Sequence, residues 1–158
     1  MIYKATEADI SAIADMAVLL WEESTIEELT AEFAEIIHSD ECAVFLSIKE
    51  NTAVGFAQVQ LRHDYVEGTE SSPVGYLEAI FVKSEYRKCG YAKELLKQCE
   101  KWATEKGCAE FASDCELTNN ISLAFHLSMG FTEANRIICF TKKLSNDIDR
   151  QNLVCTNI

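Results

Sequence analysis

The chain has 158 residues, 48% of them hydrophobic, which is typical of one globular domain with a substantial core. Its net charge of −12 argues against nucleic acid as a partner. No apolar stretch approaches the roughly 20 residues that a membrane span needs. The seven cysteines are odd in number and form no Cys-x-x-Cys pair. We therefore expect no disulfide framework, no metal site and no membrane partner. With no signal-peptide run at the start, a cytoplasmic protein is expected.

Charge is distributed unevenly along the chain. Between Lys4 and Lys49 there is no lysine or arginine, whereas eleven Asp and Glu residues fall there. Such a block is typical of a solvated acidic face. It can also attract and orient a polycation.

The pattern of apolar residues predicts eleven elements in chain order. They are a strand at 2–4, helices from about 12 to 21 and at 26–38, strands at 42–48, 53–61 and 75–82, a helix at 91–105, a strand at 109–114, a helix at 121–129, and final strands around Phe131 and at 136–143. The strands at 42–48 and 53–61 form a hairpin turned at Asn51, and Thr25 with Glu28 forms a capping box. This order predicts an α/β fold with a mixed, largely antiparallel sheet flanked by about four helices. We expect residues 1–144 to form this domain and 145–158 to be a polar tail.

The turn before the helix at 91–105 reads R-K-C-G-Y-A, residues 87–92. Free backbone amides open that helix, and Gly90 would let a pyrophosphate approach them closely. The chain contains neither G-x-x-x-x-G-K-[ST] nor G-x-G-x-x-G, which disfavours a P-loop and a dinucleotide fold. A glycine-containing loop with two solvated basic residues remains an equal alternative from these residues alone.

This turn also resembles the acyl-CoA loop of the GCN5-related N-acetyltransferase (GNAT) superfamily, Gln/Arg-x-x-Gly-x-Gly/Ala, with Arg87, Gly90 and Ala92 in the defined positions. NNISLAFHLSMGF (119–131) resembles the second CoA-contacting segment of the superfamily, and the order of elements agrees with the GNAT fold over roughly residues 1–144. The resemblance implies acetyl-CoA as cosubstrate. It implies cofactor contacts from Ile80, Phe81, Val82, Arg87, Lys88, Cys89, Gly90, Tyr91, Ala92, Lys93 and Asn119.

Two further stretches and one tryptophan resemble the aminoglycoside 6′-N-acetyltransferases, which are antibiotic-resistance enzymes. The stretches are RHDYVEGTESSPVGYLEAIFV (62–82) and EFASD (110–114), and the tryptophan is Trp21, after the first helix. This resemblance implies an acidic acceptor cleft with substrate contacts from Trp21, Tyr65, Glu78 and Asp114. For Trp21 and Tyr65, ordinary half-buried packing is the alternative. Where relatives carry an acidic drug contact, this chain has Asn135, so we expect that contact to be weakened or replaced.

Direct attack of an amine on a thioester needs no nucleophilic serine or cysteine, but a group must take the proton of the amine. Glu78 is the leading candidate, because it lies in an apolar strand and would share a face with Ile80. Asp114 would act as a second carboxylate that binds an ammonium group. His126 stands where many superfamily members carry a tyrosine that protonates the CoA thiolate. The alternatives are that Glu78 is a surface carboxylate, that Asp114 caps a turn, and that His126 is a core or surface histidine.

The sequence therefore favours an acetyl-CoA-dependent aminoglycoside 6′-N-acetyltransferase. The nearest alternative is an enzyme of the same superfamily that acetylates a polyamine or a protein N-terminal amine. A non-catalytic acyl-CoA-binding module is a further alternative. We also expect a homodimer, because members of this subgroup usually pair and terminal strands offer an edge to another chain.

Overall fold

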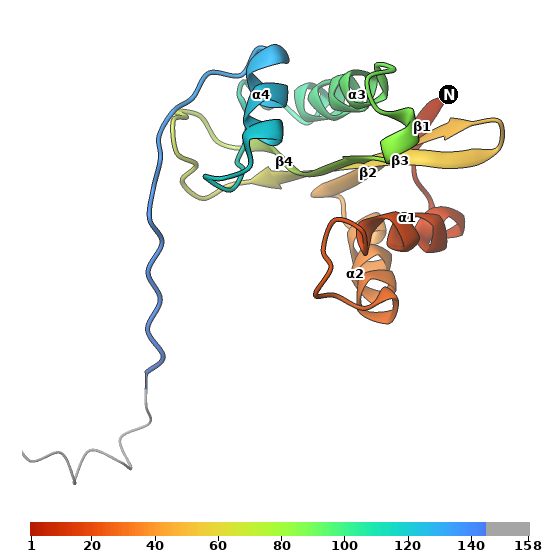
Figure 1. Cartoon of the computed structure of the whole chain (residues 1–158). Helices are drawn as coiled ribbons and strands as arrows, with labels where there is room; N and C mark the ends of the chain where they lie inside the picture. Colours follow the sequence, from red (N-terminus) through yellow and green to blue (C-terminus); the bar gives the residue numbers. More distant parts are fainter. Residues whose placement is uncertain (145–158) are drawn as a thin grey trace, which may run out of the picture.

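The computed structural model describes residues 1–144, in which helices cover both faces of a five-stranded sheet (Figure 1). The strands are β1 (Ile2–Lys4), β2 (Cys42–Lys49), β3 (Thr52–Arg62), β4 (Val74–Val82) and β5 (Phe111–Ser113). The helices are α1 (Ile10–Ala17), α2 (Ile26–His38), α3 (Tyr91–Glu105) and α4 (Asn120–Ser128), with 3-10 turns at Glu7–Asp9 and Ser84–Tyr86. The predicted tail, 145–158, lies outside the described residues.

The sheet has the order β1-β2-β3-β4-β5. Its first three pairings are antiparallel, and β5 joins β4 in parallel. The predicted mixed, largely antiparallel sheet is therefore confirmed. No helix within residues 1–144 is long and apolar enough to cross a membrane.

Local sequence signals explain two of these elements. Glu50 and Asn51 have φ of 49° and 63°, the left-handed values that a two-residue turn needs to join β2 to β3 in a tight hairpin. At the start of α2, the Glu28 amide donates to Thr25 Oγ1 at 3.2 Å, and the Thr25 amide donates to Glu28 Oε2 at 2.9 Å. The predicted hairpin and capping box are both confirmed.

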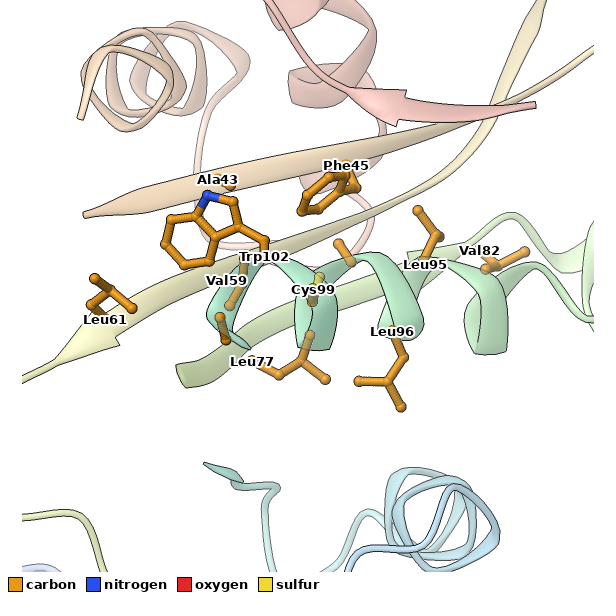
Figure 2. Packing of buried hydrophobic residues seen from close by; sticks show 12 residues of the cluster. Ala43, Phe45, Val59, Leu61, Leu77, Val82, Leu95, Leu96, Cys99 and Trp102 are labelled. Atoms are coloured by element: carbon orange, nitrogen blue, oxygen red, sulfur yellow. The ribbon is translucent and has the colours of Figure 1, made fainter. Parts of the chain in front are cut away.

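The hydrophobic core lies on both sides of the sheet. On one side, Leu95, Cys99 and Trp102 of α3 pack against Phe45 and Leu77 (Figure 2). On the other side, α1 and α2 contribute a second buried cluster that includes Ile13, Met16, Leu29 and Phe33. The sheet is thus held between α3 on one face and the α1–α2 pair on the other.

A β-bulge in β4 changes where the side chains of this strand point. Gln58 pairs with Ala79 and Val59 pairs with Leu77, which leaves Glu78 as an extra residue. Leu77 and Ile80 pack on the α3 side, whereas Ala79 packs on the α1–α2 side. Glu78 bonds to Arg62, which follows Leu61 of the α3 side and therefore lies on the opposite face of β3. The expected shared face of Glu78 and Ile80 is therefore wrong.

The final strands predicted around Phe131 and at 136–143 are not formed. Residues 131–144 follow an extended path that leaves the domain (Figure 1). An extended segment becomes a strand only when its backbone bonds to a neighbouring strand, and within the described chain no backbone–backbone hydrogen bond involves residues 132–144. Apolar residues of this segment, which include Ile137 and Phe140, remain exposed. The first predicted helix is also shorter than expected, because α1 ends at Ala17 and Leu19 and Leu20 are exposed.

Candidate active site

The loop before α3 has the geometry of an anion-binding turn. Gly90 is the N-cap of α3 with φ of 87°, and Lys88 also has a positive φ, of 60°. No side chain caps the helix, so the first amides, which begin at Tyr91, have no side-chain partner. A Cβ built on Gly90 meets no atom within 4 Å, so the space beside it is open. Arg87 Nε donates to the Val82 carbonyl at 2.9 Å and closes the loop onto the end of β4.

One edge of β4 is free next to this loop. The pairing of β4 with β5 ends at Leu77 and Ser113, whereas β4 continues to Val82. Beyond Leu77, no strand of the described chain pairs with that edge, so backbone groups of Ile80–Val82 remain available to an extended ligand. Asn119, the other predicted cofactor contact, is the N-cap of α4, and its Oδ1 accepts from the Ser122 amide at 3.0 Å.

A cleft of about 970 Å³ lies between the loop after β3, strand β5, α4 and the segment that follows α4. It brings together four of the predicted residues, namely Tyr65, Asp114, His126 and Asn135. Its lining is mainly acidic in charge, with Glu67, Glu100, Glu110, Asp114, Glu116 and Glu133 against Arg62 and Arg136. A polycation would therefore be attracted to this cleft.

Trp21 and Glu78 are not among the residues that line the cleft. Trp21 is half-buried and packs on Phe33 of α2, with ring centroids 6.4 Å apart. Glu78 reaches the cleft only through Arg62, whose Nε donates to Oε1 at 3.0 Å and whose Nη2 donates to Oε2 at 2.9 Å.

Arg62 belongs to a chain of contacts that joins the two predicted carboxylates. Its guanidinium carbon lies 3.4 Å from the centroid of the Tyr76 ring, and the Tyr76 hydroxyl donates to Asp114 Oδ1. Tyr76 is only 6% exposed. Burial, and secondly the bond to Asp114, raises the pKa of Tyr76 well above its usual value, so the phenol stays neutral. Sequence reasoning missed both Arg62 and Tyr76 as site residues, although both lie inside the resemblance at 62–82.

His126 links α4 to the end of β5. Its Nδ1 lies 2.7 Å from the Ser122 carbonyl, and its Nε2 lies 2.9 Å from Ser113 Oγ. Because a carbonyl only accepts, Nδ1 carries the proton in the neutral ring, and Nε2 is then an acceptor. Ser113 Oγ also lies 3.1 Å from the Leu77 carbonyl, so its single proton has two possible acceptors. A proton leaving or reaching Nε2 can pass through this hydroxyl.

Glu67 is a second residue that the sequence did not single out. Tyr65 donates from its hydroxyl to Glu67 Oε2 at 3.1 Å, and Asn135 Nδ2 donates to Glu67 Oε1 at 3.2 Å. Tyr65 itself is 79% exposed, so its ring is free to stack on a sugar. The Glu67 carboxylate thus places a negative charge beside the amide of Asn135.

Glu110 fixes the loop that carries Tyr65 and Glu67. Its carboxylate accepts from the Ser71 amide at 2.8 Å, from Ser71 Oγ at 2.6 Å and from the Glu70 amide at 3.0 Å. The Ser71 hydroxyl and then the Glu70 amide hold the pKa of Glu110 below its usual value. Glu110, the residue before β5, thereby anchors the loop that forms one wall of the cleft.

The cysteines within residues 1–144 show no sign of activation. The six within the described residues are free thiols, and burial raises the pKa of Cys99 well above the ordinary value. Among residues 1–144, no group of three or more His, Cys, Asp and Glu side chains is placed to hold a metal ion.

Comparison with known proteins gives consistent matches. Residues 12–131 match the acetyltransferase (GNAT) family. An aminoglycoside N(6′)-acetyltransferase type 1 from Salmonella typhimurium is 41% identical over 124 residues, which span 78% of this chain and 86% of the relative. One from Stenotrophomonas maltophilia is 40% identical over 146 residues, or 90% and 93% of the two chains. The solved structure of AAC(6′)-Iy with the bisubstrate analog CoA-S-monomethyl-acetylneamine is 36% identical, covers 91% of this chain and 98% of its own, and has a TM-score of 0.88.

Proposed function

The chain belongs to the acetyltransferase (GNAT) family, and we propose that it acetylates the 6′-amine of aminoglycosides and thereby confers resistance to them. The family match and the superposition on AAC(6′)-Iy confirm the GNAT resemblance, the fold and an acetyltransferase that uses acetyl-CoA. One observation carries the choice of acceptor. The relative of the same fold was solved with a bisubstrate analog that joins CoA to an acetylated neamine. The acidic cleft supports this choice, because an aminoglycoside carries several ammonium groups.

Acetyl-CoA would occupy the free edge of β4 and the loop before α3. Backbone amides of the loop from Lys88 to Lys93, which includes Cys89, Tyr91 and Ala92, would surround the pyrophosphate, with Arg87 beside them. The pantetheine arm would lie along Ile80–Val82, where free amides can polarise the thioester carbonyl. Asn119 would contribute from the start of α4.

The reaction itself is a direct transfer. The acceptor ammonium loses a proton, and its nitrogen attacks the thioester carbon. The nitrogen then loses a second proton as the C–S bond breaks, which gives a neutral amide and the CoA thiolate. The thiolate then takes a proton and leaves as the thiol. Glu78 is proposed as the proton acceptor, directly or through water, and Asp114 as the group that binds an ammonium. In its doubly protonated form, His126 would give its Nε2 proton to Ser113 Oγ, whose own proton would pass to the thiolate, and the ring would be left with its proton on Nδ1.

Tyr65, Glu67 and Asn135 would line the acceptor side of the cleft, with the Tyr65 ring against a sugar. The position of Trp21, packed on Phe33, supports the packing alternative at least as well, so its role as a substrate contact stays a prediction.

Two substrates that differ at one group test the function. Neomycin carries a 6′-amine, and paromomycin carries a hydroxyl at that position. We expect CoA release with neomycin and tobramycin, and much slower release with paromomycin. Spermidine and a peptide with a free N-terminus cover the alternative acceptors. Faster turnover of either than of tobramycin would contradict the proposal. Absence of turnover with every amine, despite acetyl-CoA binding, would favour the non-catalytic module.

The expected homodimer and cytoplasmic location also remain proposals. Ile137, Ile138, Phe140 and Leu144 are exposed in an extended segment, and such apolar chain is suited to pair with a second copy. Light scattering at micromolar concentration should give twice the monomer mass; the mass of a single chain would contradict pairing. The free thiols among the described residues support a reducing compartment.

A further inference from the structure

Arg62 is placed to control the two carboxylates of the candidate site differently. It binds Glu78 through two parallel N–H···O bonds of 3.0 and 2.9 Å, a geometry that fixes the plane of the carboxylate. The same guanidinium lies over the Tyr76 ring, which limits its own movement. Glu78 is 21% exposed and Arg62 is 38% exposed, so this pair is only partly open to water.

The two carboxylates differ in how far a neighbouring group compensates their negative charge. Glu78 is bonded to a cation, so its charge is largely neutralised locally. Asp114 accepts from the neutral phenol of Tyr76 and keeps its full negative charge. Asp114 also lines the acidic cleft, whereas Glu78 does not. An ammonium group of the acceptor therefore meets Asp114 as the uncompensated anion.

The bulge explains why Glu78 needs such a partner. As the extra residue of β4, Glu78 has no partner in the pairing with β3, so the register does not fix its direction. Arg62, at the end of β3, supplies this restraint from the neighbouring strand. Glu78 directly follows Leu77, the last residue of β4 that pairs with β5, so Arg62 restrains it at the residue where the free edge of β4 begins.

We propose that Arg62 is a positioning residue for acetyl transfer: it orients Glu78 for the chemical step and leaves Asp114 as the carboxylate that binds the acceptor. This inference rests on the proposed function. Loss of Arg62 should lower kcat without raising KM for the drug. Loss of Arg62 removes a positive charge from the acceptor cleft, so KM for a polycationic drug stays the same or falls. The freed Glu78 loses its orientation, so kcat falls.

Arg62→Gln and Arg62→Lys test this prediction with tobramycin as acceptor. We expect Arg62→Gln to lower kcat about tenfold or more, the scale on which small misplacements act, without raising KM for the drug. Arg62→Lys keeps the charge but loses the planar fork, so kcat should fall while KM stays close to that of the wild type. In a Glu78→Gln background, Arg62→Gln should add little to the loss of kcat, because the group that it positions is already gone.

Arg136→Gln is the matched control. Arg136 lines the same cleft and binds Glu133 by a comparable fork, with Nε–Oε1 of 2.5 Å and Nη2–Oε2 of 3.0 Å, but it touches neither Glu78 nor Tyr76. Any change in kcat caused by Arg136→Gln should be the same factor in the wild type and in the Glu78→Gln background. Melting temperature and KM for acetyl-CoA identify variants that are merely misfolded.

Three outcomes would overturn the inference: a raised KM for the drug in Arg62→Gln, an unchanged kcat, or losses that multiply with those of Glu78→Gln. Failure of the proposed function is separate, because it would appear as absence of tobramycin acetylation in the wild-type protein.

Discussion

Replacing Gly90 with alanine tests whether the loop before α3 binds acetyl-CoA through its backbone. Gly90 has φ of +87°, and an added Cβ would meet no heavy atom within 4 Å. The substitution therefore adds left-handed strain without a clash, and this strain costs about 1–2 kcal/mol of folding free energy. Each kcal/mol lowers Tm by roughly 2–4 °C in a chain of this size.

Gly107→Ala separates this strain from the effect on the cofactor. Gly107 has φ of +89°, and its added Cβ would also meet nothing within 4 Å, so both variants should lose similar stability. The two glycines flank opposite ends of α3, about 25 Å apart at 1.5 Å per residue. Only the methyl group at position 90 would stand where the pyrophosphate approaches.

Steady-state kinetics then measure the cofactor effect. Loss of one charge-assisted hydrogen bond to the pyrophosphate, about 1.5–3 kcal/mol, would raise KM for acetyl-CoA about 10- to 100-fold. KM for tobramycin should change little, and Gly107→Ala should leave both constants near their wild-type values. Equal KM values for acetyl-CoA in the two variants would refute the assignment of the loop.

Two other predictions concern the walls of the cleft, and one concerns the packing of α3 on β4. Glu67→Gln should raise KM for tobramycin with kcat retained, and adding Asn135→Asp should restore part of the loss, because it returns a carboxylate to the same wall; no rescue in steady-state assays would show that this charge does not bind the drug. Gly75→Ala would bring a Cβ within 2.5 Å of the Ala103 side chain, so thermal melting should show a loss of about 1–3 kcal/mol, and wild-type stability would contradict this packing. Glu110 has a pKa below its usual value of 4.5, so its contribution to stability is present above that pH and lost as the pH falls through the folded-state pKa. Glu110→Gln should therefore flatten the acid side of the stability curve in denaturant titrations, and an unchanged curve would contradict the anchoring role.

Sequence reasoning succeeded where the signal was local. The capping box of Thr25 with Glu28 and the hairpin at Asn51 both follow from neighbouring residues, so no knowledge of tertiary structure is needed. The final strands failed for the opposite reason. A short apolar run such as residues 137–140 indicates that a segment can be a strand, but not which strand would pair with it.

The same limit applies to the candidate site. Glu78 and Asp114 could be proposed from the sequence because carboxylates in an apolar strand and at a strand end are conspicuous. Their partners were not, because Arg62 and Tyr76 meet across the β3–β4 pairing. A bulge, which shifts two-residue alternation by one, leaves no mark in the apolar pattern of β4.

The bulge also determines which groups surround the Glu78 carboxylate. Regular alternation would have placed Glu78 on the face of Ile80, beside α3 and away from Arg62. The bulge removes that alternation, and Arg62, whose guanidinium also covers the Tyr76 ring, binds Glu78 on the opposite face. One carboxylate is thereby neutralised and held, while the other, Asp114, keeps its charge at the cleft. Two residues of the same chemical type thus differ in their surroundings: Glu78 is bound by a guanidinium at an irregular backbone position, whereas Asp114 accepts from a neutral phenol and lines the cleft.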